Sequence, residues 1–167
     1  MKHLFKYSRP YLLHCFVYCV LMCSCADKEI INSKELPDDI HSLENLLEND
    51  PLEVDQKMAV YYELSKKHRT DHLELADSYT DKLISLSEQV KSKYFLARGH
   101  YMKGMIGKEK GNYQQAVNHY IISSDLFDKL NDELWNADAL NNIGDIFYNI
   151  QGYDLALPYL QKASTIY

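Results

Sequence analysis

Apolar residues recur at helical spacing along most of the chain after residue 38. The first such stretch has the i, i+3, i+6, i+7 spacing that places side chains on one face of a helix. It predicts a helix of about ten residues. Its apolar face consists of Ile40, Leu43, Leu46 and Leu47.

Helix-start and turn residues divide the next part of the chain. Asp50-Pro51 supplies an N-cap residue and a Pro suited to the first helical position, so a second helix is predicted to start there. It is predicted to continue to about His68. Arg69-Thr70-Asp71 then predicts a turn, and a further helix is predicted from His72 to about Lys91.

Small and aromatic positions come into register without a gap when the chain is aligned with itself at a period of 40. A fixed period of this kind indicates a repeat array. Each unit would consist of two antiparallel helices, with turns near Thr70, Gly111-Asn112 and Gly152. The aligned sets are Ala59, Gly99 and Ala139; Leu64, Gly104 and Gly144; Leu73, Tyr113 and Tyr153; and Ala76, Ala116 and Ala156.

The small and aromatic residues of these units resemble the tetratricopeptide repeat. The first unit keeps mainly Tyr61 and Ala76, and the second departs from the pattern at Gly107 and Ser123. The resemblance covers about residues 57–167, with a period above the usual 34. The second unit matches at Tyr101, Gly104, Tyr113, Ala116 and Tyr120, and the third at Leu140, Ile143, Gly144, Phe147, Tyr153, Ala156, Leu160 and Ala163.

This resemblance implies an all-α fold. The expected architecture is a right-handed solenoid of helical hairpins, with about three tetratricopeptide-repeat-like (TPR-like) units of period 40 and one additional N-terminal helix. It also implies a non-enzymatic scaffold that binds a protein or peptide along its concave face. Gly104 and Gly144 would let the two helices of one unit pack with axes about 8 Å apart, where only small side chains fit. Gly107 has no such explanation in the repeat register.

The first 25 residues have the layout of an export signal. Basic residues come first, an apolar run covers residues 11–22, and all four cysteines of the chain lie at or before position 25. The apolar run is short for a spanning helix, which needs about 20 residues. Met22-Cys23-Ser24-Cys25 resembles the lipobox of bacterial lipoproteins, which implies cleavage before Cys25 and lipid attachment to it.

Two departures from the lipobox leave alternatives open. Met22 replaces the usual Leu, and Cys23 is a second candidate for modification. A plain secretory signal and an uncleaved anchor are the rival interpretations. The expected organisation is a signal peptide over 1–24, a polar tether over 25–37 and a repeat domain over 38–167, lipid-anchored in the bacterial cell envelope at the outer membrane or periplasmic face.

Composition and charge narrow the possible partners. The six Gly and four Pro in 167 residues argue against a turn-rich all-β fold. The net charge is −6, and loss of Lys2, Lys6 and Arg9 with the signal peptide would leave 15 basic against 24 acidic residues. The basic footprint of a nucleic-acid-binding protein is absent. We therefore expect no nucleic-acid partner for this region.

Two polar clusters resemble sites of chemistry but have simpler interpretations. His68 and His72 have the i, i+4 spacing of a helical metal site, but Thr70-Asp71 between them predicts a helix break, so a solvated turn is favoured. We also expect a solvated acidic helix face, because paired carboxylates need a pocket before they act in catalysis. We predict no catalytic, cofactor-binding or metal-binding residues. The acidic face comprises Asp71, Glu74, Asp77 and Asp81.

The first helix of each unit supplies the candidate partner groove. In the repeat family these positions line the concave face, where Tyr offers rigid amphipathic contact area and Asn can pair with a peptide backbone. Tyr113, Tyr120, Tyr153 and Tyr159 are instead expected to pack helices together. The predicted groove consists of Tyr61, Ser65, Arg98, Tyr101, Met105, Lys108, Asp138, Asn141, Asn142, Asp145 and Tyr148.

The last residues, 163–167, contain no polar cap of the kind that ends a solenoid. We therefore expect the chain to be part of a longer one, or its last helix to dock, for example in a homodimer. Similar arrays with an export segment resemble the extracytoplasmic sensor regions of larger histidine kinases or transcription regulators. That sensor is the alternative to a lipid-anchored scaffold.

Overall fold

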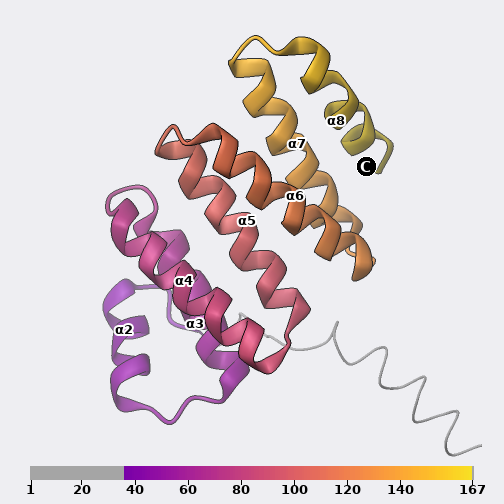
Figure 1. Cartoon of the computed structure of the whole chain (residues 1–167). Helices are drawn as coiled ribbons and strands as arrows, with labels where there is room; N and C mark the ends of the chain where they lie inside the picture. Colours follow the sequence, from indigo (N-terminus) through magenta and orange to yellow (C-terminus); the bar gives the residue numbers. More distant parts are fainter. Residues whose placement is uncertain (1–35, 167) are drawn as a thin grey trace, which may run out of the picture. The chain divides into compact units, whose positions relative to one another are not determined.

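The computed structural model describes residues 36–166, and every regular element in this range is an α-helix. The predicted signal peptide, Cys25 and all but the end of the predicted tether lie outside the described residues. Within 36–166, no helix has both the length and the apolar character needed to cross a bilayer. The helices labelled in Figure 1 are α2 (Ile40–Asn49), α3 (Val54–His68), α4 (Leu73–Val90), α5 (Lys93–Glu109), α6 (Tyr113–Lys129), α7 (Glu133–Asn149) and α8 (Tyr153–Ile166).

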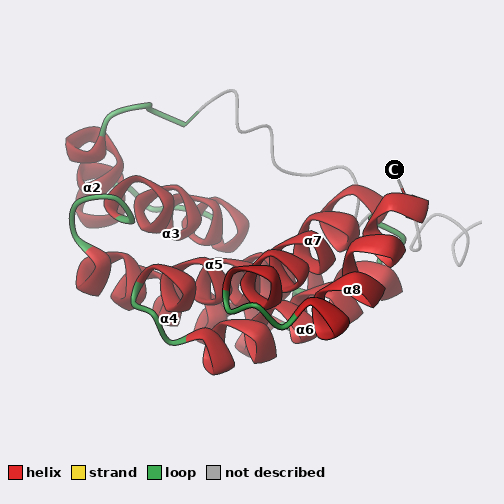
Figure 2. Ribbon diagram, turned by 90° about the horizontal axis from the view of Figure 1, so that it is seen from above, coloured by secondary structure: helices red, strands yellow, loops and turns green. Residues whose placement is uncertain are grey.

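The helices pack in chain order as three helical hairpins. α3 packs on α4, α5 on α6 and α7 on α8, and α4–α5 and α6–α7 contacts join each hairpin to the next. Figure 2 shows α3, α5 and α7 along one side of this array and α4, α6 and α8 along the other. The predicted all-α, TPR-like solenoid with one additional N-terminal helix is confirmed.

One backbone turn recurs at equal intervals along the array. Lys91, Gly111, Asn131 and Gln151 adopt left-handed conformations, with φ between 53° and 76°. Each turn ends a helix in the same way; at the second, for example, the residue after Gly111 donates its N–H to the Gly107 carbonyl at 2.8 Å. Helices α4 to α8 accordingly start at equal intervals along the chain. The period of 40 is therefore two helix-turn units of equal length.

Small residues meet large ones where the helices of a hairpin cross. A Cβ on Gly104 would lie 2.7–2.9 Å from the Tyr120 ring, and one on Gly144 would lie 2.5 Å from the Leu160 side chain. Gly107, which had no explanation in the repeat register, also lies in a close contact. A Cβ there would lie 3.3 Å from the Cβ and backbone N of Ala116, where α5 meets the start of α6.

The first hairpin differs from the ungapped alignment by one residue. Ser65, not Leu64, faces the second helix, because its hydroxyl lies 2.6 Å from that of Thr80 and donates to the Ala76 carbonyl at 2.9 Å. Thr80 is the counterpart of Tyr120 one repeat earlier, so Ser65 occupies the position that Gly104 has in the second hairpin. Leu64 instead packs against α2 and is fully buried.

The predicted start of α3 is wrong. Asp50 follows the last turn of α2 as its C-cap, and Pro51 lies in the connecting loop. The helix begins three residues later, at Val54. There the backbone N–H of Glu53 donates to the Gln56 side chain at 3.2 Å, a reciprocal capping arrangement that Pro51 cannot supply.

The last residues of the predicted tether belong to the helical unit. Leu36 packs on the apolar cluster formed by Leu43, Val60 and Leu64, which are fully buried between α2 and α3. Asp38 forms an ion pair with Lys67 at 2.7 Å. Leu36 therefore takes part in the packing of the helical unit.

Two of the four tyrosines expected in the core are exposed. Tyr120 is fully buried, and Tyr159 stacks on Phe147 with ring centroids 5.8 Å apart. Tyr113 and Tyr153 each occupy the first position of a helix and remain 41% and 55% exposed. The apolar Leu155 and Leu157 of α8 are also exposed, and the expected homodimer through this helix stays a prediction.

We expect Gly104→Ala to destabilise the protein by about 1–3 kcal/mol, because the added methyl overpacks the Tyr120 ring. The same kind of substitution in an open helix interior stabilises by about 1 kcal/mol. The measurement is the free energy of unfolding in urea, with Asn118→Ala on the exposed face of α6 as the control. A stabilised Gly104→Ala protein would contradict the close crossing.

Candidate functional site

Arg98 lies at the centre of the face formed by the first helices. Its guanidinium carbon is 3.9 Å from the ring centroid of Tyr62 on α3 and 4.3 Å from that of Trp135 on α7. One guanidinium nitrogen donates to the Tyr94 hydroxyl at 2.7 Å. The salt bridges found within residues 36–166 do not include Arg98, and its Nε is buried without a hydrogen-bond partner there.

A row of polar side chains continues from this arginine. The Trp135 ring meets the Tyr101 ring edge to face at 5.0 Å, and the Tyr101 hydroxyl accepts a hydrogen bond from Asn142 at 3.1 Å. The Lys108 ammonium donates to the side-chain oxygen Oδ1 of Asn142 at 3.2 Å and lies 3.9 Å from the Asp145 carboxylate. We call this set the first-helix face: Tyr62, Arg98, Tyr101, Lys108, Trp135, Asn142 and Asp145.

The other predicted groove residues lie at different places. The prediction that Ser65 lines the groove is wrong, because its hydroxyl is buried against α4. Tyr61 contacts Tyr79 of α4 instead of Arg98. Tyr148 is 59% exposed and packs edge to face on Tyr153 of α8.

Three predicted residues border the first-helix face. Asp138 is half-buried, and its carbonyl accepts a hydrogen bond from Asn142 at 2.9 Å. Asn141 is exposed, and Met105 packs on the core below.

Trp135 on the first-helix face was not predicted from the sequence. It is the chain's single Trp, a residue type enriched at binding hot spots, and this was the available signal.

The two histidines at the first turn have different surroundings. His68 is buried rather than solvated, stacked on Tyr79 with ring centroids 5.7 Å apart and 3.7 Å from Glu44. His72 is exposed. The described residues contain no group of three or more His, Cys, Asp or Glu side chains that could hold a metal ion.

The acidic face of α4 is only partly solvated. Asp77 pairs with Lys103 at 2.5 Å and Lys110 at 2.9 Å, while Asp81 and Glu74 each pair with one of these lysines. Burial raises the pKa of the Asp77 carboxyl, but the hydrogen bonds and charges of the two lysines outweigh burial and hold that pKa below its ordinary value. These carboxylates therefore join the first hairpin to the second.

A histidine pair joins α5 and α6 beside this network. The Nδ1 atoms of His100 and His119 lie 3.1 Å apart, and their rings are nearly parallel. Burial, the neighbouring His119 and Lys103 lower the pKa of His100 to about 4. Burial and Lys103 also lower the pKa of His119, against the opposing effect of Asp77 and Asp81. The pair is therefore held neutral at pH 7.

Comparison with known families matches the tetratricopeptide repeat model to residues 97–121. Within this chain, these residues therefore resemble one tetratricopeptide repeat. The matched residues run from α5 through the Gly111 turn into α6, so the repeat includes Arg98, Tyr101 and the Gly104–Tyr120 crossing. Repeats of this type act in protein–protein interaction and carry out no catalysis of their own.

A curated relative is "Uncharacterized protein ycf37" of Guillardia theta, 32% identical over 82 residues. The match covers 49% of this chain and 46% of the relative, so the chain spans about half the length of the curated relative it matches.

We expect stability to fall as pH decreases from about 6.5 towards 4, because His100 of the unfolded chain takes up a proton that the folded protein excludes. Above pH 6.5 this contribution is fully present. Urea unfolding at pH 7.5 and 5.0 should show a larger loss for the native protein than for His100→Gln. His41→Gln, an exposed control, should match the native protein. Equal losses in all three proteins would contradict the buried neutral pair.

Proposed function

We propose that this chain is a non-enzymatic scaffold that binds an extended segment of a partner protein across the first-helix face, with Arg98 as the central anchor. The observation that carries the proposal is the position of Arg98 between two aromatic rings of neighbouring hairpins. Arg, Trp and Tyr together are typical of the few residues that dominate binding energy at interfaces.

The preorganisation of these side chains supports the proposal. Tyr62 and Tyr101 are 7% and 8% exposed, and stacking holds the Arg98 guanidinium in place. Binding therefore costs little side-chain entropy on this face, because its side chains are already held in place. The side-chain amide of Asn142 is likewise held by Tyr101, Asp138 and Lys108, and its oxygen can accept a second hydrogen bond from the backbone of a bound peptide.

A photo-crosslinking amino acid at Asn141, which is exposed next to this face, should yield covalent protein adducts in native cells. The same group at Asn118, exposed on α6, is the matched control and should yield none of these adducts. Arg98→Ala should reduce the adducts at least about tenfold, the effect of losing about 1.4 kcal/mol of binding energy.

Adducts that are equal at both positions, or that Arg98→Ala leaves unchanged, would contradict a partner on the first-helix face. Arg98→Ala also removes stacking inside the protein, so its melting temperature is measured in parallel. Asn142→Leu, which removes polar groups without opening the Arg98 contacts, serves as a second variant and should weaken the same adducts.

We propose further that the scaffold is exported and held in the bacterial envelope by lipid on Cys25. The support is the basic start, the apolar run and the Met22-Cys23-Ser24-Cys25 sequence. Lipid chains contribute about 0.8 kcal/mol per buried CH₂, enough for firm anchoring when several are attached.

Mass spectrometry of the protein from host membranes should show an N-terminal peptide that begins at Cys25 and carries diacylglyceryl and acyl groups. Cys25→Ala should abolish the modification, while Cys23→Ala is the control and should retain it. An unmodified or uncleaved N-terminus would contradict the lipid anchor.

A further inference from the structure

One face of α8 is uncovered among residues 36–166, although α6 buries the equivalent face against α7. Val117 of α6 is 6% exposed and belongs to the core cluster that includes Ala139 of α7. Two turns farther along α6, the Ser124 hydroxyl donates to the Asn136 side chain of α7 at 2.6 Å. The first helix of the third hairpin therefore covers this side of the second.

The same two positions of α4, one repeat of 40 residues earlier, are covered by α5. Asp77 pairs with Lys103 of α5 at 2.5 Å. Ile84 lies against Gly99 of α5, where an added Cβ would come within 2.6 Å of the Ile84 side chain. Both joints between hairpins thus use equivalent positions on the second helix of a hairpin.

On α8, these two positions are occupied by Leu157 and Ser164. Leu157 is 55% exposed, and Ser164 is exposed as well. Tyr153, one turn before Leu157, is exposed and packs edge to face on the exposed Tyr148 at the end of α7. A contiguous exposed apolar patch of this kind is typical of a site at which another molecule docks. We call this set the α8 face: Tyr148, Tyr153, Leu157 and Ser164.

The α8 face carries no charge, unlike the joint between α4 and α5. There Asp77 and Asp81 form ion pairs with Lys103, whereas Leu157 and Gln161 stand at the corresponding positions of α8. In a two-fold dimer both copies contribute the same patch, so the patch must be complementary to itself. An uncharged apolar face meets this condition, because no like charges are placed opposite each other.

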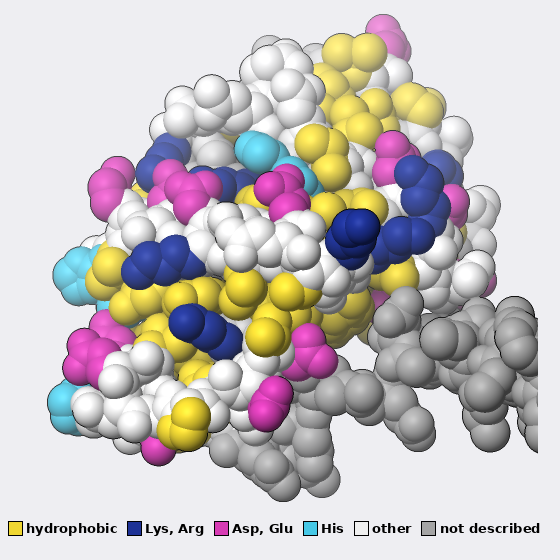
Figure 3. All heavy atoms as spheres, turned by 60° about the horizontal axis from the view of Figure 1, so that its bottom comes forward, with side chains coloured by type: hydrophobic (Ala, Val, Ile, Leu, Met, Phe, Trp, Pro, Cys, Tyr) yellow, Lys and Arg dark blue, Asp and Glu magenta, His cyan; other side chains and the backbone are white. Residues whose placement is uncertain are grey.

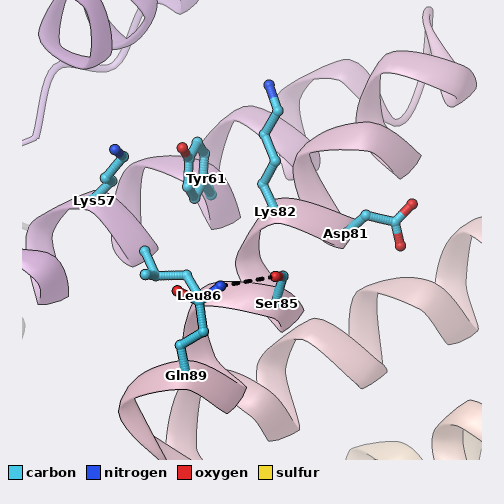
Figure 4. A pocket seen from close by; sticks show the side chains of 7 residues that line it. All are labelled: Lys57, Tyr61, Asp81, Lys82, Ser85, Leu86 and Gln89. Carbon is cyan, nitrogen blue, oxygen red and sulfur yellow. Dashed lines mark hydrogen bonds between the residues drawn. The ribbon is translucent and has the colours of Figure 1, made fainter.

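The opposite end of the array is not suited to the same contact. α2 packs on α3 there, and Figure 4 shows a hollow of about 380 Å³ between α3 and α4, with Tyr61 and Leu86 in its middle and Lys57 and Lys82 at its sides. Neither lysine forms an ion pair within residues 36–166. Figure 3 shows Lys and Arg interleaved with hydrophobic side chains on this side. Two copies that met at this end would therefore bring like charges together.

We infer that two copies of this chain associate through the α8 face, with the two α8 helices antiparallel about a two-fold axis beside Leu157. Leu157 of one copy then packs against Leu157 of the other, and Tyr153 covers the rim of the contact. Antiparallel helices oppose their dipoles and keep the two Asp154 carboxylates apart, whereas parallel helices would bring them together. The contact does not include Arg98, so this dimer and the proposed binding of a partner protein can each hold without the other.

The test is sedimentation equilibrium of the full-length protein at increasing concentration. Reducing conditions are used because the chain contains four cysteines. We expect a reversible equilibrium between monomer and dimer. Leu157→Glu should raise the dissociation constant at least about tenfold, because each dimer would then hold two carboxylates at its axis.

The matched control is Leu155→Glu on the same helix. Leu155 is 57% exposed, and its counterparts in the two preceding hairpins, Leu75 and Gln115, are exposed too, so neither joint covers this position. The control should dimerise like the native protein. Melting curves establish that both variants are folded.

A mixture of the Leu157→Glu and Leu157→Lys proteins should recover the dimer, because only a two-fold axis brings this position against itself. Failure of the mixture to recover it would overturn the two-fold contact. A native protein that stays monomeric would overturn the proposal, as would a dimer that Leu157→Glu and Leu155→Glu affect equally. Assemblies larger than the dimer would overturn it too, since they would mean that α8 docks on a different face of the next copy.

Discussion

The second and third hairpins each depend on one close helix crossing, at which a glycine meets a large side chain. Gly104 lies against the Tyr120 ring and Gly144 against Leu160, so the axes of paired helices approach closely. Contacts between α4 and α5 and between α6 and α7 join these hairpins in turn, and Arg98 on α5 contacts a ring from the hairpin on either side.

The fold could be predicted from the sequence because its information is local and repeated. Alanine and glycine recur in register, and the chain between them has helical spacing of apolar residues. The first hairpin was misaligned because Ser65 fills the crossing position and bonds to Thr80, which the repeat signature does not require. The start of α3 was misplaced because Asp50-Pro51 resembles a cap, whereas the capping residues are Glu53 and Gln56.

The candidate site was predictable only in part, because its contacts cross between hairpins. The register correctly placed Arg98, Tyr101 and Asn142 on first helices, but it contains no information on which rings stack. Tyr62 and Trp135 belong to the hairpins before and after that of Arg98, and they meet it only after the array has formed. In the repeat register, Ser65 falls at a position expected to line the groove. In the structure its hydroxyl is instead buried against α4, where it donates a hydrogen bond to the Ala76 carbonyl.

The distribution of cations follows the same architecture. The protein has a net charge of −6. Ion pairs join its first hairpin to its second: Asp77 pairs with Lys103 and Lys110, and Arg69 pairs with Glu109. Within residues 36–166, Arg98 forms no ion pair, whereas Lys108 of the same first-helix face lies 3.9 Å from Asp145 of the next hairpin.

The left-handed turns at Lys91, Gly111, Asn131 and Gln151 limit how such a chain can change in length. A single inserted residue rotates the rest of a helix by about 100° and turns its apolar face away from the neighbouring helix. Insertion of a whole hairpin with its two turns restores both the helix direction and the face that is buried. Genetic events that gain or lose whole hairpins would therefore leave the remaining interfaces intact, and the array can lengthen its binding surface without redesigning its core.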